Sequence, residues 1–137
     1  MKNKNIKPVK KSQTTNQPKK IKPRQKQILI LTYKFRFLNR PQIQTLLNHK
    51  HRKKIILWLN YLSDEKYLKR YYSKKFAGNP AFYSLGTYGR KYFKEHTEIK
   101  DIKIPLLDRV WEEGNYTDKF KKHCMFVGDI YISLVKL

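Results

Sequence analysis

Two amphipathic helices joined by a short polar turn are the feature that most constrains the fold of this chain. Asn39 is a good N-cap, and Pro41 falls in a first helical turn, where the missing N–H of proline costs nothing. The apolar residues that follow at helical spacing are Ile43, Leu46 and Leu47. After Asn48 a longer helix is predicted, ending near residues 63–65. Its core face consists of Ile55, Leu59 and Leu62, with Trp58 beside them.

The segments on either side of this helix pair add a further helix before it and a β-hairpin and helix after it. Residues 24–38 predict a helix, although the alternation of Tyr33, Phe35 and Phe37 with bases leaves a strand as the less favoured alternative. The core residues expected on this helix are Ile28, Leu31, Tyr33 and Phe35. Residues 67–72 and 81–85 predict a β-hairpin around a Gly-Asn-Pro turn, and another helix starts at 86 or 87. The fold class is therefore mainly α with a small β-hairpin: a winged helix-turn-helix domain plus a C-terminal amphipathic helix.

Composition divides the chain into four parts. Residues 1–23 are rich in Lys and Pro and predict a disordered basic N-terminal arm, residues 24–96 the winged domain, and residues 97–116 a linker. Residues 117–137 predict the amphipathic helix. Its apolar residues are spaced 4, 3, 4, 3 along the chain: Phe120, Cys124, Val127, Tyr131 and Leu134. We expect this face to pack against the chain's own first helix, or to pair with a second copy in a homodimer.

The charge of the chain points to a polyanionic partner. The formal net charge is +22 over 137 residues, and no acidic residue precedes Asp64. Such an excess indicates nucleic acid or an anionic membrane. The chain has neither an apolar signal segment nor a run long enough to span a bilayer, so we expect a cytoplasmic protein, associated with plasmid or nucleoid. The single cysteine, Cys124, excludes an internal disulfide and a cysteine-paired zinc site.

The densest positive charge, residues 49–54, coincides with the predicted start of the longer helix. Cations at a helix N-terminus oppose the macrodipole, at a cost of roughly 0.3–1 kcal/mol each. In a helix-turn-helix this end of the second helix enters the major groove, so the charge is explained by DNA contact. Arg52 is the candidate for reading guanine, because its planar fork can bond O6 and N7 together. The neighbouring candidates are His51 and the three lysines expected on phosphate: Lys50, Lys53 and Lys54.

Further candidate contacts lie on either side of this block. Asn60 is two turns along the same helix. The hairpin supplies Arg70 and, at its tip, Lys74 and Lys75. At the start of the preceding helix, where backbone N–H groups can meet a phosphate, the candidates are Arg40, Gln42 and Gln44. The hairpin aromatics Tyr71, Tyr72, Phe82 and Tyr83 are expected in the core; stacking on unpaired bases is the less favoured alternative.

No catalytic, metal-binding or cofactor-binding residues are predicted. His49 and His51 resemble the two-histidine metal motif of rolling-circle nickases, but that motif needs an apolar residue between the histidines, on a strand. The acids are scattered without the spacing of a metal cluster. His123 beside Cys124 is at most half of a nucleophilic pair, and Cys124 lies on the apolar face of its helix.

The sequence resembles the replication-relaxation proteins of plasmids and other mobile elements. The resemblance rests on ILILTYKFRFLNRPQIQTLL, RKKIILWLNYLSDEKYLKR and AFYSLGTYGRKYF, with a looser likeness in KKHCMFVGDIYISL. It covers residues 26–96 and 119–134. It implies a winged-helix domain and a role at replication. Members of that family usually continue into a further domain, so the resemblance also implies that this chain is a truncated or minimal version.

The expected function is double-stranded DNA binding in plasmid or mobile-element replication or its control. One alternative is a transcriptional regulator similar to MarR or ArsR proteins, which share part of the pattern. Alternatives of other classes are an origin nickase or nuclease, and a non-specific binder of RNA or single strands.

Overall fold

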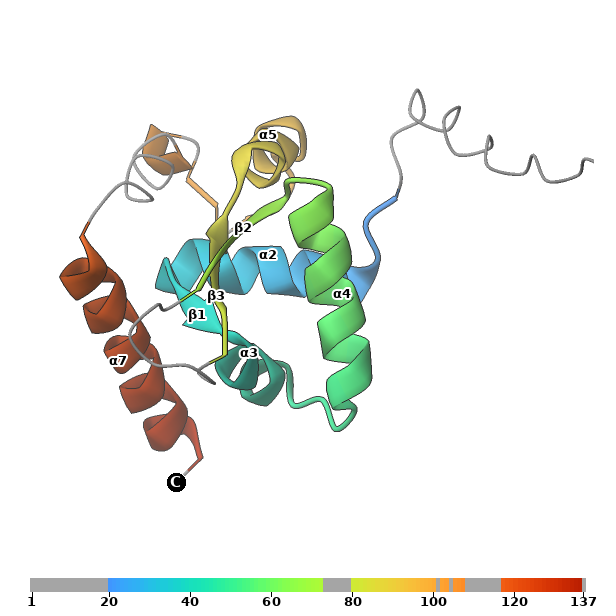
Figure 1. The fold of residues 1–137 in the computed structure, drawn as a ribbon. Coiled ribbons are helices and arrows are strands. Elements are labelled where there is room, and N and C mark those ends of the chain that lie inside the picture. Colours follow the sequence, from blue (N-terminus) through green and yellow to red (C-terminus); the bar gives the residue numbers. More distant parts are fainter. Residues whose placement is uncertain (1–19, 73–79, 101, 104, 108–116, 137) are drawn as a thin grey trace, which may run out of the picture.

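The computed structural model of the chain describes residues 20–72, 80–100, 102–103, 105–107 and 117–136. Its elements follow in the order α2 (Pro23–Phe35), β1 (Leu38–Asn39), α3 (Arg40–Leu47), α4 (Arg52–Asp64), β2 (Leu68–Tyr71), β3 (Phe82–Leu85), α5 (Thr87–Glu95) and α7 (Asp118–Val135). This order confirms the predicted winged helix-turn-helix, with α3 and α4 as the helix pair and β2–β3 as the wing (Figure 1).

A small antiparallel sheet organises the domain. Strand β3 lies between β1 and β2, with Leu38 paired to Tyr83 and Tyr71 paired to Phe82. Strand β1 was not predicted, because two residues are too short to establish a period. Asn39 ends this strand and also caps α3, since its Oδ1 accepts the backbone N–H of Gln42 at 2.9 Å.

The core is assembled from all of these elements, and α2 crosses behind the sheet as a helix, not a strand. Its buried face differs from the predicted one. Ile28 and Tyr33 are buried as expected, but Leu31 and Phe35 are only half-buried, and the other buried positions are Gln25, Leu29 and Thr32. Thr32 is tolerated there because its hydroxyl donates to the carbonyls of Ile28 and Leu29.

Helix α4 begins later than predicted. His51 is its N-cap and Arg52 its first residue, so the first part of the basic block lies in the turn and not in the helix. Asn48 ends α3 in the left-handed conformation (φ 56°), which asparagine accepts more readily than most residues. The predicted core face of α4, Ile55, Leu59 and Leu62, is buried.

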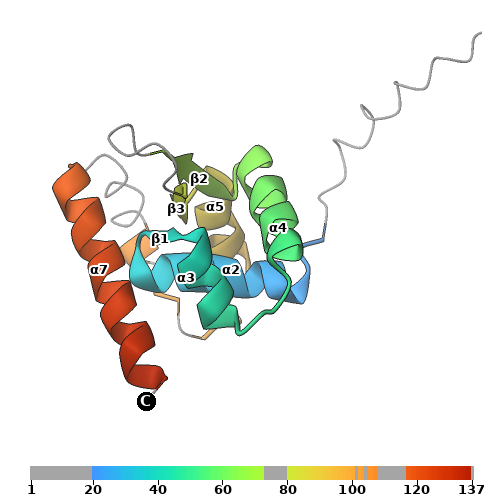
Figure 2. The same ribbon diagram turned by 60° about the horizontal axis from the view of Figure 1, so that its bottom comes forward.

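Helix α7 packs against α2, α3 and β1, on the side of the sheet away from α4 (Figures 1 and 2). Only part of the predicted packing face meets the chain's own core, because Val127 and Leu134 are 44% and 62% exposed. Pairing of this face with a second copy stays a prediction. The buried positions are Cys124 and Gly128. Gly128 brings no side chain to the contact, and an added Cβ would lie 3.3 Å from Leu38 Cδ2, so the two elements approach closely there.

The segments predicted to lie outside the folded core are only partly described. Residues 1–19 of the predicted arm, and residues 101, 104 and 108–116 of the predicted linker, lie outside the described residues. Within the linker range, Ile102 and Leu107 are buried in the core, and the Lys103 N–H donates to the Tyr33 hydroxyl at 3.1 Å. Ile21 is half-buried against the same core.

Candidate nucleic-acid interface

The turn between α3 and α4 is braced by side chains from both helices. Gln44 donates from Nε2 to the His49 carbonyl at 3.1 Å, and its Oε1 accepts from Arg40 Nη1 at 3.4 Å. The His49 ring packs edge-on against Trp58 of α4, with centroids 5.1 Å apart, and its Nδ1 accepts the His51 N–H. Arg40, Gln44 and His49 therefore shape the turn that presents the residues after it.

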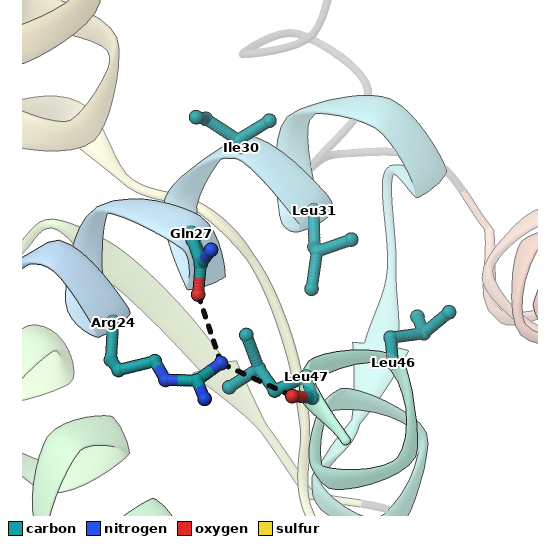
Figure 3. Close-up of a pocket in the computed structure, with 6 residues that line it drawn as sticks. All are labelled: Arg24, Gln27, Ile30, Leu31, Leu46 and Leu47. Carbon is teal, nitrogen blue, oxygen red and sulfur yellow. Dashed lines mark hydrogen bonds between the residues drawn. The ribbon is translucent and has the colours of Figure 1, made fainter. Parts of the chain in front are cut away.

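Arg24 adds a brace that the sequence did not reveal. From the first turn of α2 its Nη1 reaches the Leu47 carbonyl at the end of α3 and Gln27 Oε1, each at 3.1 Å (Figure 3). A cation at a helix C-terminus satisfies an orphan carbonyl and complements the dipole. Arg24 lies within a long basic stretch, so nothing in the pattern distinguished it from its neighbours.

Five consecutive basic residues follow the brace, and we call them the basic turn: Lys50, His51, Arg52, Lys53 and Lys54. All five are exposed, and the first turn of α4 contains neither an acidic residue nor a side-chain cap. The dipole therefore disfavours this end of α4 in isolation. The turn gathers a positive charge that bound phosphate would offset.

The outer face of α4 continues from the basic turn. Lys53, Leu57 and Asn60 are exposed and follow one another at one helical turn, opposite the buried Ile55 and Leu59. We refer to Lys53, Leu57 and Asn60 as the outer face of α4. It starts in the basic turn at Lys53 and ends at Asn60, which bonds Arg70 of the wing.

Arg70 of β2 joins the wing to that face. Its Nη2 donates to Asn60 Oδ1 at 2.7 Å, its Nη1 to the Tyr72 hydroxyl at 3.4 Å, and its guanidinium lies over the Tyr83 ring at 5.5 Å. Burial raises the pKa of Tyr83 above its ordinary value, and the charge of Arg70 offsets part of that rise. The arrangement holds one wing cation at a fixed place beside α4.

Gln42 was predicted as a DNA contact, and the structure contradicts this prediction. It is 4% exposed and turned away from the basic turn, donating from Nε2 to the Met125 carbonyl at 2.8 Å and to Asp129 Oδ1 at 2.7 Å. Its Oε1 accepts the Asn39 N–H, which completes a capping box. Gln42 therefore fixes α7 to the start of α3 and has no surface to offer a ligand.

The remaining residues considered for the wing are two lysines at its tip and four aromatic residues on its strands. Lys74 and Lys75 lie outside the described residues. Tyr71 and Phe82 stack on each other at 5.1 Å, Phe37 packs edge-on against both, and Lys121 of α7 lies 4.2 Å from the Tyr71 ring. Tyr83 is buried, as predicted, whereas Tyr72 is 69% exposed.

The described part of the chain was also predicted to hold no metal site and no membrane span. Within the part of the chain that the structure describes, no three His, Cys, Asp or Glu side chains come together as a metal site. Cys124 is buried against the domain. Among the helices described, none has the length and hydropathy needed to cross a bilayer.

The fold, the braced turn and the wing define the class: this is a winged helix-turn-helix protein. A model of the replication-relaxation family matches residues 29–137, which is most of the chain. The protein therefore belongs to the replication-relaxation family.

Comparison with solved structures supports the same fold. The adhesin competence repressor AdcR from Streptococcus pyogenes is similar with a TM-score of 0.51 and 15% identity, over 90% of this chain and 85% of that one. Comparison with curated proteins gives no match.

Proposed function

We propose that the protein binds double-stranded DNA, with the basic turn and the outer face of α4 in the major groove and Arg70 on the flanking backbone. The observation that carries this proposal is the exposure of the whole basic turn at the start of α4, fixed by Gln44 and His49. That end of the second helix is where helix-turn-helix proteins meet base edges. Arg52 is the base-reading residue, and the lysines bind phosphate.

The test measures affinity for random duplex, single strand and RNA across a salt series, for the wild type and two variants. Arg52→Ala is expected to lose sequence discrimination, by about 1–3 kcal/mol at a guanine. Lys54→Ala is expected to weaken all duplexes alike and to reduce the salt slope by about 0.9. Lys91→Ala is the matched control, because Lys91 is equally exposed but lies on α5, away from the α3–α4 turn (Figure 1). Equal binding of all three polymers, unchanged by either variant, would defeat the proposal.

The family supports a proposal for the biological setting. We place the protein in the cytoplasm, on plasmid or nucleoid DNA, acting in replication of a mobile element or its control as a binding protein without catalysis. Plasmid copy number should change with Arg52→Ala and not with Lys91→Ala. Cleavage of a supercoiled origin plasmid in magnesium or manganese, abolished by His123→Ala, would instead make it a nickase.

A second candidate function is transcriptional regulation. It is favoured by the likeness to AdcR, a repressor, although that likeness is one of fold. A reporter with the bound sequence placed across its promoter separates the two settings. Repression without any effect on copy number would favour the regulator.

We further propose that two copies associate through the outward side of α7. Four large apolar side chains are 44–62% exposed there: Phe126, Val127, Ile130 and Leu134. Tyr131 lies beside them, with its ring against Phe35 of α2. The one charged residue between positions 126 and 135 is Asp129, which bonds to Gln42. In a chain of net charge +22, an uncharged strip is where a second copy approaches with least repulsion.

Sedimentation equilibrium tests this association. The wild type is expected to be dimeric and Leu134→Glu monomeric, while Lys122→Glu, which changes charge on the same helix outside the strip, is expected to remain dimeric. A wild-type monomer at high concentration would contradict the second copy as occupant.

A further inference from the structure

Leu57 is exposed in the middle of a surface that is otherwise polar. Its side chain is 65% exposed, more than any other aliphatic residue among those the structure describes. Outside α7, the other large apolar side chains exposed in the described part of the chain are Tyr72 and Tyr88, and each of these has a hydroxyl for water. The Leu57 side chain has no polar group that could hydrogen-bond water. Its exposure in the isolated protein therefore contributes no stabilisation.

The position of Leu57 on α4 is fixed by its neighbours. Lys53 lies one turn before it and Asn60 one turn after it, both exposed, while Ile55, Leu59 and Leu62 hold the opposite face in the core. The bond from Arg70 Nη2 to Asn60 Oδ1 ties the same face to the wing. Leu57 is thus at the centre of the outer face, between the basic turn and the wing.

A duplex lying on this face presents few groups that suit a leucine. The edges of base pairs in the major groove are hydrogen-bond donors and acceptors, with one apolar exception, the C5 methyl of thymine. Against that methyl, Leu57 buries apolar surface on both partners. Against the amino group of cytosine it would remove water from a donor without replacing the hydrogen bond, which is unfavourable.

We propose that Leu57 is a specificity-determining residue that packs against the methyl group of thymine in the major groove. This inference rests on the proposed duplex binding. It adds that the base selected by the centre of the outer face of α4 is thymine. Burial of one methyl corresponds to about fourfold in affinity. The protein should therefore prefer an A·T pair, in one orientation, at the position facing Leu57.

The experiment removes the methyl and the leucine separately. Duplexes are selected from a random pool with the full chain, and in an enriched duplex each thymine is replaced in turn by uracil, which lacks only the methyl. At one or two positions, uracil should weaken wild-type binding about fourfold. Leu57→Ala should bind the thymine duplex about as weakly as the wild type binds uracil, and should be indifferent to the replacement.

Two controls separate this effect from general loss of binding. Lys53→Ala, on the same face, should weaken binding yet retain the uracil effect, and Tyr88→Ala, an exposed apolar change on α5, should alter neither. A uracil effect of equal size in the wild type and Leu57→Ala, or none in either, overturns the inference while leaving duplex binding intact. A pool that enriches no sequence overturns it as well, because a side chain that reads methyls must create a preference. Absence of any duplex preference over single strands and RNA would overturn the proposed function itself.

Discussion

Gln42 joins two helices that are far apart in the sequence: its Nε2 donates to Asp129 Oδ1 at 2.7 Å, and the same atom reaches the Met125 carbonyl. Gln42 is 4% exposed, so removal of its amide takes away both bonds and leaves a space in the packing of α7, although the exposed Asp129 regains water. We expect Gln42→Ala to lower the free energy of unfolding by about 1–3 kcal/mol. Urea denaturation measures this change.

Gln44→Ala is the matched control, since Gln44 lies on the same helix but is more exposed, and its side chain bonds Arg40 of α3 and the His49 carbonyl rather than α7. It should cost less stability than Gln42→Ala while weakening DNA binding more. Equal losses of stability would contradict the role of Gln42 as the joint between α3 and α7.

Periodicity predicted the parts of the fold in which one face of a helix meets one core. Ile55, Leu59 and Leu62 are of this kind, whereas the cap at Asn39 was predicted from the capping preference of asparagine. For α7, periodicity predicted the buried Cys124 but not the close approach at Gly128, a residue without a side chain to count. The two residues of β1 could not be predicted, since their pairing with β3 depends on residues more than 40 positions away.

The sequence predicted which residues are exposed wherever charge alone decides exposure. Lysines and arginines at the start of α4 have no reason to be buried, and all of them are exposed. Gln42 was misplaced because a glutamine is equally suited to a groove of DNA and to a buried carbonyl. Only the packing of α7 against α3 decides between these two roles. It brings Met125 and Asp129, more than 80 positions later in the sequence, within hydrogen-bonding distance of Gln42.

Gly89 is the position where a single methyl group should disturb the wing. A Cβ there would lie 2.4 Å from the Tyr67 carbonyl oxygen and 2.6 Å from Leu85 Cδ1, and the backbone contact does not yield easily. Alanine gains about 1 kcal/mol of helix propensity over glycine, but overpacking costs about 1–3 kcal/mol, so we expect Gly89→Ala to be destabilising. The urea midpoint should fall. Gly128→Ala, whose Cβ meets only side-chain atoms at 3.2 Å or more, should shift it less.

Asn60 and Arg70 should have separable effects on DNA binding. Arg70→Ala removes a charge, so it should weaken binding and reduce the salt slope by about 0.9. Asn60→Ala leaves the charge but frees the guanidinium that Asn60 Oδ1 holds at 2.7 Å, so affinity should fall with the slope unchanged. Lys69→Ala is the control on the same strand, because Lys69 points to the opposite face of the sheet, near the Tyr71 ring. Identical slopes for Arg70→Ala and the wild type would show that Arg70 contacts no phosphate.

Tyr83 should make the stability of the domain depend on alkaline pH. Burial raises the pKa of its phenol above the ordinary 10.0, and Arg70 lowers it in part. A group whose pKa is raised on folding contributes stability that is complete below the unfolded pKa. The native state then retains the proton longer than the unfolded state does, so the free energy of unfolding should fall as pH rises above about 10.

The ultraviolet absorbance of phenolate and urea denaturation between pH 8 and 12 measure this dependence. In Tyr83→Phe one phenol should be missing from the part of the phenolate titration above pH 10.0, and the alkaline loss of stability should become less steep, because phenylalanine has no proton to lose. In Arg70→Ala the ionisation of Tyr83 should move to still higher pH, since the charge that favours phenolate is gone. Movement to lower pH would mean that the guanidinium disfavours phenolate, contrary to its position 5.5 Å from the Tyr83 ring.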